Sequence, residues 1–296
     1  MAIARTKLTG WTFWESLGSP KKVVAPMVDQ SELAWRILSR RYGADLCYTP
    51  MFHARLFAEE PKYRNEMWQT DSTDRPLFVQ FCANDPDHLL RAAKLVETQC
   101  DAVDLNLGCP QHIAKRGRYG SFLMEEWDLI HRMVKNLAEN LSIPVTVKIR
   151  VFPDVEKTIA YAKMIESAGA SVLTVHGRLR EQKGHKTGLA DWEQIRRVKE
   201  TLSIPVIANG NILYAEDIDL CLASTGADAV MTAEGNLYDP SGIFTGKHLP
   251  VWVIGEEVTA QPCHVRAQYL DIVKDNPKSA TTAMIRGHLF KIWKPW

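Results

Sequence analysis

The sequence predicts an α/β protein of the TIM type, a (β/α)8 barrel of parallel strands followed by a short C-terminal helical region. Eight short apolar runs, rich in β-branched residues, alternate with longer amphipathic stretches of helical periodicity. This alternation implies parallel pairing, because each helix returns the chain to the same end of the sheet. The 296 residues leave room for a barrel of about 250 residues and an appendage. We therefore expect the barrel over residues 1–250 and the helical region over 251–296.

The strand candidates are bounded by turn signals. They lie, in chain order, at residues 23–27, 45–49, 77–81, 102–107, 145–149, 172–176, 206–208 and 229–232. The helices between them have recognisable ends. Asp85 and Pro86 begin one helix, and Gly43, Gly169 and Gly226 follow the ends of three others. Each strand and the helix after it are expected to form one βα unit.

A short internal repeat supports the barrel. The segment Leu141-Ser-Ile-Pro-Val145 recurs as Leu202-Ser-Ile-Pro-Val206, two βα units later, and each copy leads into a strand candidate. The alternative is a doubly wound open sheet. No Gly-x-Gly-x-x-Gly follows the first strand candidate, however, so a dinucleotide-binding Rossmann domain lacks its main support in the sequence.

Composition narrows the class of protein. Hydrophobic residues make up 46 % and charged residues 24 % of the chain, as in ordinary globular proteins. The net charge is only +1, so the overall charge does not indicate a nucleic acid or another charged partner. The six cysteines form no Cys-x-x-Cys pair, and no stretch of eighteen apolar residues occurs. We expect a soluble protein of the cytoplasm or nucleus, with buried thiols and with neither a structural metal nor a membrane segment.

Two segments lie outside the eight units. The aromatic cluster Gly10-Trp-Thr-Phe-Trp14 could stack nucleic-acid bases, but large aromatic side chains more often cover apolar surface, here the end of the barrel. After residue 250 the βα pattern stops, and two helical stretches are expected near residues 262–274 and 278–290.

Polar side chains end most of the apolar strands. In a β/α barrel the carboxyl ends of the strands form the active face, and phosphate commonly binds after strands seven and eight. A single such residue is more often only a satisfied hydrogen-bonding group, but polar groups at apolar strand ends are costly to bury without partners. The residues at the strand ends, most of them polar, are Pro26-Met27, Gln80, Asn106, Lys148, His176, Asn209-Gly210 and Glu234-Gly235.

The charged members of this set favour an anionic ligand. Lys148 lies near the end of the apolar run Val145-Thr-Val-Lys-Ile149, so its ammonium would point into the barrel mouth and need an anionic partner. His176 ends the next strand candidate and would lie beside Lys148. Together they predict a cationic corner suited to the N1/O2 edge of a reduced flavin. Gly210 and Gly235 expose backbone N–H groups that suit a phosphate on the last two loops.

The motifs along the barrel closely resemble those of the dihydrouridine synthases, FMN enzymes that reduce uridines in the D-loop of tRNA. They cover the whole barrel in order, so the signal is specific although each motif alone is weak. The sequence Ala233-Glu-Gly-Asn-Leu237 after the last strand is similar to that of the eukaryotic branch of the family, which acts on tRNA positions 16 and 17. The matching segments are Val24-Ala-Pro-Met-Val28, Val79-Gln80, Asp104-Leu-Asn-Leu-Gly-Cys-Pro110, Val147-Lys-Ile-Arg150, Thr174-Val-His-Gly-Arg178, Ile207-Ala-Asn-Gly-Asn211 and Met231-Thr-Ala-Glu-Gly235.

The resemblance implies roles for the matching positions. The barrel over residues 1–250 would be the catalytic domain, with Met27, Gln80, Lys148 and His176 along the isoalloxazine ring and Asn106 orienting flavin and base. NADPH or NADH would reduce the flavin in the same cleft, in turn with tRNA. The full set of expected FMN contacts is Pro26, Met27, Gln80, Asn106, Lys148, His176, Asn209, Gly210, Asn211, Ala233, Glu234 and Gly235.

Cys109 is the expected general acid. Reduction of the uracil 5,6 double bond requires a hydride at C6 and a proton at C5. An ordinary thiol has a pKa near ~8.5, so it is mostly protonated at neutral pH and can donate this proton. A cysteine taken at random is more often inertly buried. The position of Cys109 in Gly-Cys-Pro on an active-face loop, together with the resemblance, favours the catalytic interpretation.

Positive charge is concentrated where RNA could reach the barrel mouth. Residues 178–186 carry four basic side chains against one acidic one, and residues 258–296 carry six against two. The family has a longer helical domain, so residues 251–296 are expected to be an incomplete tRNA-binding region. The expected substrate-binding residues are Lys115, Arg116, Arg118, Arg150 and Arg178.

Two other functions remain open at this point. One is an FMN barrel that acts on a free pyrimidine, as dihydroorotate dehydrogenases do; this explains the flavin residues but not the basic loops. The other is a non-catalytic tRNA-binding relative, against which the presence of Cys109, Lys148 and His176 together argues.

Overall fold

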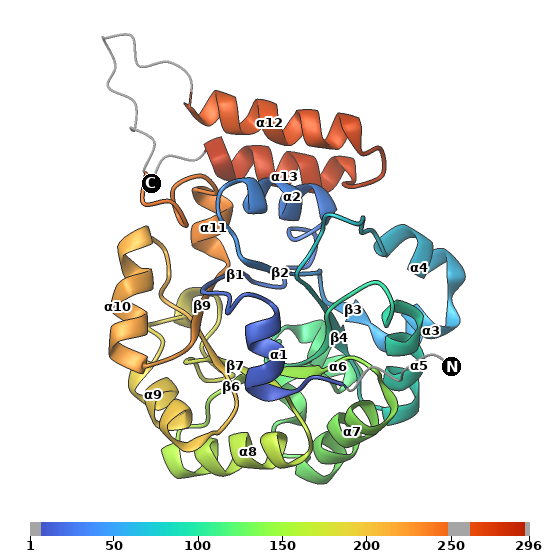
Figure 1. Ribbon diagram of the computed structural model, residues 1–296, viewed down its shortest axis with the longest axis vertical. Coiled ribbons are helices and arrows are strands. Elements are labelled where there is room, and N and C mark those ends of the chain that lie inside the picture. Colours follow the sequence, from blue (N-terminus) through green and yellow to red (C-terminus); the bar gives the residue numbers. More distant parts are fainter. Residues whose placement is uncertain (1–6, 248–260, 294–296) are drawn as a thin grey trace.

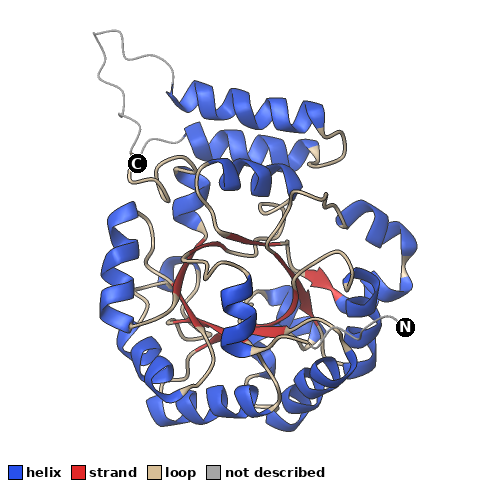
Figure 2. Ribbon diagram, viewed as in Figure 1, coloured by secondary structure: helices blue, strands red, loops and turns tan. Residues whose placement is uncertain are grey.

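The computed structural model describes residues 7–247 and 261–293, which form a closed parallel β-barrel surrounded by helices (Figures 1 and 2). Every strand pair in the ring is parallel, and the last strand pairs with the first, Met231 lying opposite Val23. The predicted TIM-type fold is confirmed. The ring strands are β1 (Lys22–Val24), β2 (Leu46–Tyr48), β4 (Leu77–Cys82), β5 (Ala102–Leu107), β6 (Val145–Arg150), β7 (Val172–His176), β8 (Val206–Asn209) and β9 (Ala229–Thr232).

The predicted strands are all present, and those at 102–107, 172–176 and 229–232 have the predicted bounds. β1 is shorter than predicted. It ends at Val24 because the chain then turns: the Met27 carbonyl accepts hydrogen bonds from the N–H groups of Gln30 and Ser31. An extra strand, β3 (Phe52–His53), pairs with β4 outside the ring. Two residues are too short a run to show a period, so the sequence does not predict it.

Helices cover the outside of the ring (Figure 2). The Asp85 side chain caps α5, accepting hydrogen bonds from the N–H groups of Asp87 and His88, as the Asp-Pro signal predicts. The longer helices are α2 (Leu33–Arg41), α5 (Pro86–Val96), α7 (Trp127–Asn140), α8 (Val155–Ser167), α9 (Trp192–Thr201) and α10 (Ala215–Thr225). The short ones are α1 (Gly10–Ser16), α3 (Ala54–Glu59), α4 (Pro61–Met67), α6 (His112–Gly117) and α11 (Glu234–Tyr238).

Helix α1 closes the amino-terminal end of the barrel, in the middle of the ring in Figure 1. Phe13 and Trp14 are buried against Val23, Phe78 and other buried residues of the strands. Trp11 remains partly exposed, and its indole N–H donates to the carbonyl of Ser203. The aromatic cluster is therefore packing, and the other end of the barrel is left for ligands.

The two predicted tail helices are present as α12 (Gln261–Asp275) and α13 (Thr282–Trp293), the second beginning four residues later than expected. They lie side by side against α2 (Figure 1). The predicted boundary between residues 250 and 251 lies outside the described residues, so the division into a barrel and a separate tRNA-binding region stays a prediction.

A buried cluster joins these tail helices to the barrel. Trp35 of α2 stacks on His288 of α13 with ring centroids 3.9 Å apart. Tyr269 of α12 packs edge-on against Trp35 with ring centroids 5.7 Å apart. Glu32 accepts a hydrogen bond from the Tyr269 hydroxyl at 2.8 Å and pairs with His288 Nε2 at 3.0 Å. The indole N–H of Trp35 donates to Asn236 of α11 at 2.7 Å. The tail is thus anchored by polar and aromatic contacts together.

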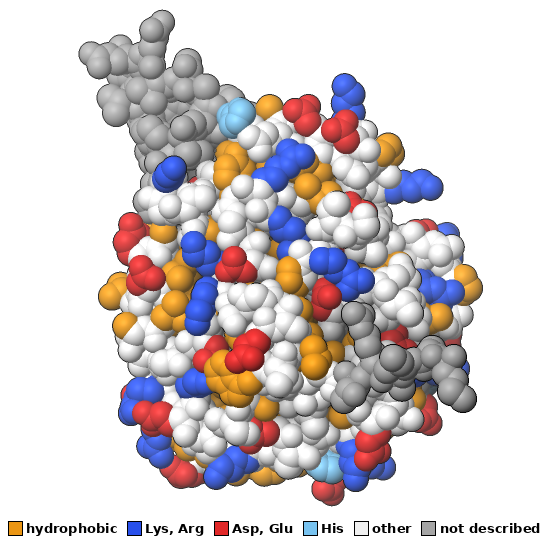
Figure 3. Space-filling model, in the orientation of Figure 1, with side chains coloured by type: hydrophobic (Ala, Val, Ile, Leu, Met, Phe, Trp, Pro, Cys, Tyr) orange, Lys and Arg blue, Asp and Glu red, His pale blue; other side chains and the backbone are white. Residues whose placement is uncertain are grey.

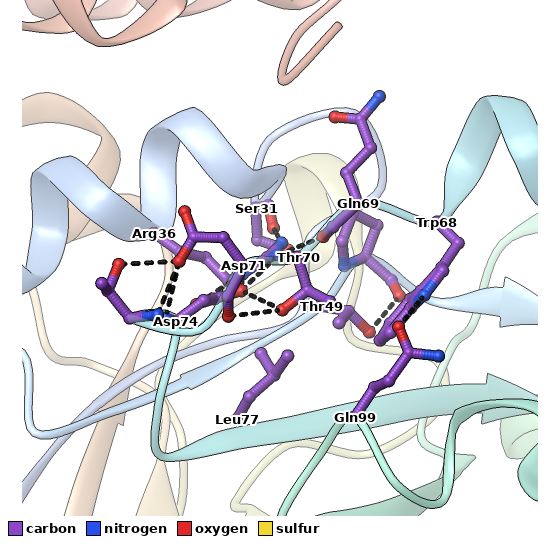
Figure 4. A network of polar contacts seen from close by, with 12 residues as sticks. Ser31, Arg36, Thr49, Trp68, Gln69, Thr70, Asp71, Asp74, Leu77 and Gln99 are labelled. Atoms are coloured by element: carbon purple, nitrogen blue, oxygen red, sulfur yellow. Dashed lines mark hydrogen bonds and ion pairs between the residues drawn. The ribbon is translucent and has the colours of Figure 1, made fainter. Parts of the chain in front are cut away.

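A second buried network, shown in Figure 4, lies around Arg36 of α2. Its guanidinium contacts Asp74 Oδ2 through Nη2 at 2.7 Å and through Nε at 3.0 Å, and both side chains are almost fully buried. The same guanidinium donates to the carbonyls of Ser31 (2.6 Å) and Gln69 (2.7 Å). The Ser31 hydroxyl in turn accepts from the Met27 N–H at 3.0 Å. Arg36 therefore fixes the turn that follows β1.

The surface on the α1 side carries intermingled basic and acidic side chains (Figure 3). Within residues 7–247 and 261–293, no helix has the length and apolar character to cross a membrane. In the same residues, no group of three or more His, Cys, Asp or Glu side chains is placed to hold a metal ion.

Candidate active site

A cavity of about 860 Å³ lies at the carboxyl ends of the strands, at the opposite end of the barrel from α1. Residues that follow or end seven of the eight ring strands line it. The fold therefore brings together side chains that are far apart in the sequence. The predicted site residues in its wall are Pro26, Gln80, Asn106, Cys109, Lys148, Arg150, His176, Arg178, Asn209, Gly210, Asn211, Ala233 and Glu234.

Gln80 and Asn106 are oriented by a buried carboxyl that the sequence analysis did not single out. Asp104 accepts from Gln80 Nε2 at 2.8 Å and from the Thr146 hydroxyl at 2.6 Å, and Asn106 Nδ2 donates to Gln80 Oε1 at 2.8 Å. Burial raises the pKa of Asp104 to about 6, although the hydrogen bonds from Thr146 and Gln80 act in the opposite direction. Ionised Asp104 can only accept, so both amides have one orientation.

Lys148 is buried and has a polar partner. Its ammonium donates to Asn209 Oδ1 at 2.7 Å, and Asn209 Nδ2 donates to the Met231 carbonyl at 2.9 Å, which holds the amide oxygen toward the lysine. Burial and the nearby Arg150 charge lower the pKa of Lys148 to about 7. An anion bound here would favour the charged form of this lysine.

His176 is neutral, which corrects the expectation that it adds a positive charge to Lys148. Burial lowers its pKa well below the usual value, and the charges of Lys148, Arg150 and Arg178 act in the same direction. Arg178 Nη1 lies 3.0 Å from His176 Nε2. Since a guanidinium only donates, Nε2 accepts and the ring proton is on Nδ1. Arg178 also donates to Asn211 Oδ1 at 2.8 Å, so the cationic corner is formed by Lys148 and the arginines.

Two glycines allow close backbone packing at the last two loops. Gly210 has φ of +113°, and an added Cβ would lie 2.6 Å from the Ala190 Cβ. At Gly235 an added Cβ would lie 2.7 Å from the Ile212 carbonyl oxygen, and this backbone atom cannot swing aside. Glycine is therefore required at residue 210 in the cavity wall and at residue 235 in the backbone packing behind it.

The Cys109 loop is held by its backbone. Asn106 Oδ1 accepts from the N–H groups of Gly108 (3.1 Å) and Cys109 (2.9 Å). The Cys109 carbonyl accepts from the Ser121 N–H at 3.1 Å and from its hydroxyl at 3.0 Å. The thiol is half-buried and lines the cavity.

A protein-family model for dihydrouridine synthase (Dus) matches residues 23–293 of this chain. The chain belongs to the dihydrouridine synthase family. It is 57 % identical to the tRNA-dihydrouridine(16/17) synthase [NAD(P)(+)] of Saccharomyces cerevisiae, over 98 % of this chain and 69 % of that protein. It is 54 % identical to the tRNA-dihydrouridine(16/17) synthase [NAD(P)(+)]-like protein of Rattus norvegicus, over 97 % of this chain and 63 % of that protein.

Similarity to a solved structure supports the fold of this dihydrouridine synthase family member. The crystal structure of the Amycolatopsis orientalis BexX/CysO complex matches with a TM-score of 0.50 and 16 % identity, covering 87 % of this chain and 92 % of that chain. At this level of identity the match concerns the fold alone. The family, in contrast, follows from the sequence matches, as the motifs of the barrel predict.

Some predicted site residues of this family member lie away from the cavity. Met27 packs its side chain against the hydrophobic core, and Gly235 stands behind the wall. Lys115 and Arg116 are exposed on α6, and Arg118 is exposed at its end, 3.8 Å from Glu126. Their contacts with cofactor or RNA stay predictions.

Two apolar residues at the mouth of the cavity are not predicted by the sequence. Val28 is 54 % exposed and Leu189 is 80 % exposed, and both line the cavity. Single apolar residues in loops carry no periodic signal, so no sequence pattern identifies them. Beside this mouth runs a groove of about 890 Å³ between α4 and α13. Asp29, which lines the groove, directly follows Val28, so the two spaces are neighbours.

Proposed function

We propose that this protein is an FMN-dependent tRNA-dihydrouridine synthase that reduces uridine at positions 16 and 17 of the D-loop with NADPH or NADH. The observation that carries the proposal is the convergence of Gln80, Asn106, Lys148 and Cys109 on one cavity of the barrel. The names of the relatives support the substrate and the reductant. Their greater length leaves the activity of this chain to experiment.

The cavity fits FMN in size and in chemistry. Its volume of about 860 Å³ lies within the range of roughly 300–1,000 Å³ that is usual for small-molecule sites. The amides of Gln80 and Asn106 and the ammonium of Lys148 lie in adjacent strands along one wall, suited to the hydrogen-bonding edge of a planar ring. Gly210 and Gly235 would shape the phosphate end. Bound FMN would supply the hydride for C6 of the uracil ring.

Residues of the chain would supply the rest of the chemistry. Lys148 would stabilise negative charge at the ring edge, and the Nδ1 proton of His176 is available to donate a hydrogen bond, since Nε2 faces Arg178. Cys109 would give its proton to C5. Because the reductant and the RNA would use the same cavity, we expect ping-pong kinetics, in which one product leaves before the second substrate binds.

The RNA would approach from the mouth. A base in a folded tRNA must leave its stack to reach a buried site. Lys115, Arg116 and Arg118 lie on one exposed segment directly after the Cys109 loop and would contact phosphates. The neighbouring groove leads to the tail helices, which would hold more of the tRNA.

Purified protein tests the proposal directly. It should be yellow, release FMN on denaturation, and convert unmodified tRNA to dihydrouridine at positions 16 and 17 when NADPH is present. Reduction of free uracil compounds without reaction on tRNA would support the free-pyrimidine alternative instead. A protein that holds no flavin after reconstitution with FMN would contradict both enzymatic functions.

Replacing Lys148 or His176 with alanine should weaken FMN retention, because both side chains line the proposed flavin site. The loss of one charge-assisted hydrogen bond costs about 1.5–3 kcal/mol, or about 10- to 150-fold in Kd. The Kd is measured by fluorescence titration of the apoprotein. Lys163→Ala, on the exposed surface of α8, is the matched control. Unchanged FMN affinity in both variants would remove these residues from the site.

Reduced FMN should bind more weakly as the pH rises from 7 to 9. The lowered pKa of Lys148, about 7, means that this side chain loses its proton in the empty site over this range. An anionic ring requires the charged form, so affinity should fall by up to about tenfold per pH unit. Anaerobic titration with reduced FMN measures the slope. In Lys148→Met affinity should be low and nearly independent of pH; an equal slope in both proteins would contradict the assignment.

The double variant Arg116→Ala/Arg118→Ala should bind tRNA more weakly and with a flatter salt dependence. Each lost phosphate contact reduces the slope of log affinity against log salt by about 0.7–0.9, because fewer counterions are released. Filter binding at several salt concentrations measures it. The control Lys135→Ala/Lys163→Ala removes two exposed lysines from α7 and α8. A slope equal to that of the wild type would place the RNA surface elsewhere.

A further inference from the structure

The backbone of the Cys109 loop is held from two sides. Asn106 holds the N–H groups of Gly108 and Cys109 from within the barrel. From the other side, Arg150 Nε donates to the Gly108 carbonyl at 2.9 Å, and Lys183 Nζ donates to the Pro110 carbonyl at 2.7 Å. Cationic side chains of other segments therefore bind the carbonyl groups of Gly108 and Pro110, the residues on either side of Cys109.

Arg150 binds backbone with most of its guanidinium. Besides Gly108, it donates through Nη1 to the carbonyls of Leu179 (2.7 Å) and Gln182 (3.1 Å). Its side chain is buried, with only 7 % of the residue exposed. Burial and the Arg178 charge lower its pKa to about 10, so it is still charged at neutral pH. A lysine could not reach three carbonyls in this fork geometry.

The Leu179 and Gln182 carbonyls that Arg150 binds belong to the loop after β7, which is cross-linked within itself. Gln182 Oε1 accepts from the Leu179 N–H at 2.7 Å, and Gln182 Nε2 donates to the Leu189 carbonyl at 3.2 Å. Arg178 Nε donates to the Gly188 carbonyl at 3.1 Å. Since Gly188 and Leu189 line the cavity, this loop forms one wall of the site and the Cys109 loop forms the next.

We propose that Arg150 and Lys183 are positioning residues that lock the Cys109 loop to the loop after β7, so that the thiol keeps its place over the cavity. This rests on the proposed role of Cys109 as proton donor. It gives Arg150 a backbone-binding role in addition to the substrate contact that the sequence predicts. Loosening the lock would misplace the acid without removing it, and misplacement of about 1 Å can cost 10²-fold in rate.

The experiment uses the FMN-loaded full chain with Arg150→Lys, Arg150→Ala and Lys183→Met, and with Lys163→Met as the control for a lost lysine. Anaerobic stopped flow follows flavin reduction by NADPH and flavin reoxidation by unmodified tRNA separately. The rate of Cys109 alkylation by iodoacetamide, read by peptide mass spectrometry, reports access to the half-buried thiol and the mobility of its loop without any substrate. Added guanidinium ion tests chemical rescue of Arg150→Ala.

We expect reoxidation by tRNA to fall by about 10²-fold in the Arg150 variants, with reduction by NADPH close to the wild-type rate. Cys109 should be alkylated several-fold faster in Arg150→Ala and Lys183→Met, since the loop opens more often, and guanidinium should partly reverse this in Arg150→Ala. The Lys163→Met rates should equal those of the wild type.

The proposal would be wrong if the Arg150 and Lys183 variants had the same alkylation and reoxidation rates as the wild type. If Arg150→Ala does not fold, Lys183→Met still tests the lock by the same two rates, since its side chain is only partly buried. If wild-type protein makes no dihydrouridine in tRNA, the proposed function is wrong. The alkylation rates of Cys109 then test the positioning role of Arg150 and Lys183 by themselves.

Discussion

Cys109→Ala is expected to slow the reoxidation of reduced flavin by tRNA by about 10²–10⁴-fold, the usual loss for one positioned general acid. Folding, FMN content and reduction by NADPH should remain, because the loop is held through the backbone of Cys109 and not through its thiol. Its N–H donates to Asn106 and its carbonyl accepts from Ser121. Alanine keeps all of these contacts.

The measurement is anaerobic stopped flow with reduced enzyme and unmodified tRNA, together with the yield of dihydrouridine. Cys221→Ala serves as the control, since this buried thiol of α10 lies outside the cavity wall. Equal reoxidation rates in wild type and Cys109→Ala would sink the assignment of the acid. Slow reduction by NADPH in the variant would show instead that the thiol shapes the flavin site.

Asp74→Ala is expected to destabilise the barrel by about 3–5 kcal/mol, because it leaves the buried guanidinium of Arg36 without its carboxylate. Arg36 and Asp74 are almost fully buried, and Arg40 also contacts Asp74 at 3.2 Å. Burial alone would raise the pKa of Asp74, but Arg36 and Arg40 outweigh it, so the pKa is lowered. This stabilisation is present above the ordinary value of 3.8 and is lost as the pH falls through the lowered pKa.

Urea denaturation at pH 7 and at pH 3 measures the difference in the free energy of unfolding. The variant should be far less stable than wild type at pH 7, and the gap should narrow at pH 3. Glu193→Ala, which removes an exposed partner of Arg196, is the control and should change stability by less than about 1 kcal/mol. A similarly small change for Asp74→Ala would mean that the Arg36 network contributes little.

The sequence predicted the barrel well because each βα unit carries its own local signals. The polar residues at strand ends were identified because Gln80, Asn106 and Lys148 interrupt apolar runs. Asp104 was overlooked as a member of the site even though it lies in one of the matching motifs. Its importance depends on lying opposite Gln80 in the neighbouring strand, and the stagger between two strands of a barrel cannot be read from either strand alone.

The charge and the side-chain direction of site residues were harder to predict than their positions at the strand ends. The neutral state of His176 follows from burial and from three cations around it, and the sequence shows only one of these, Arg178, close by. Met27 is predicted to line the flavin because it ends the strand candidate at residues 23–27 and lies in a matching motif. The strand ends at Val24, and the partly buried Met27 side chain packs against core residues; its contact with the flavin stays a prediction.

The tail helices are joined to the barrel by the buried contacts among Glu32, Trp35, Tyr269 and His288. These contacts limit which segments can be exchanged between relatives in a chimaeric protein. Tail helices transplanted from a relative with another uridine preference would meet a Glu32 and a Trp35 selected for different neighbours. A buried carboxylate left without its partners is costly, so we expect such a hybrid to lose stability, which would confound any test of its specificity. The transferable module is therefore the tail helices together with α2 and the residue that precedes it.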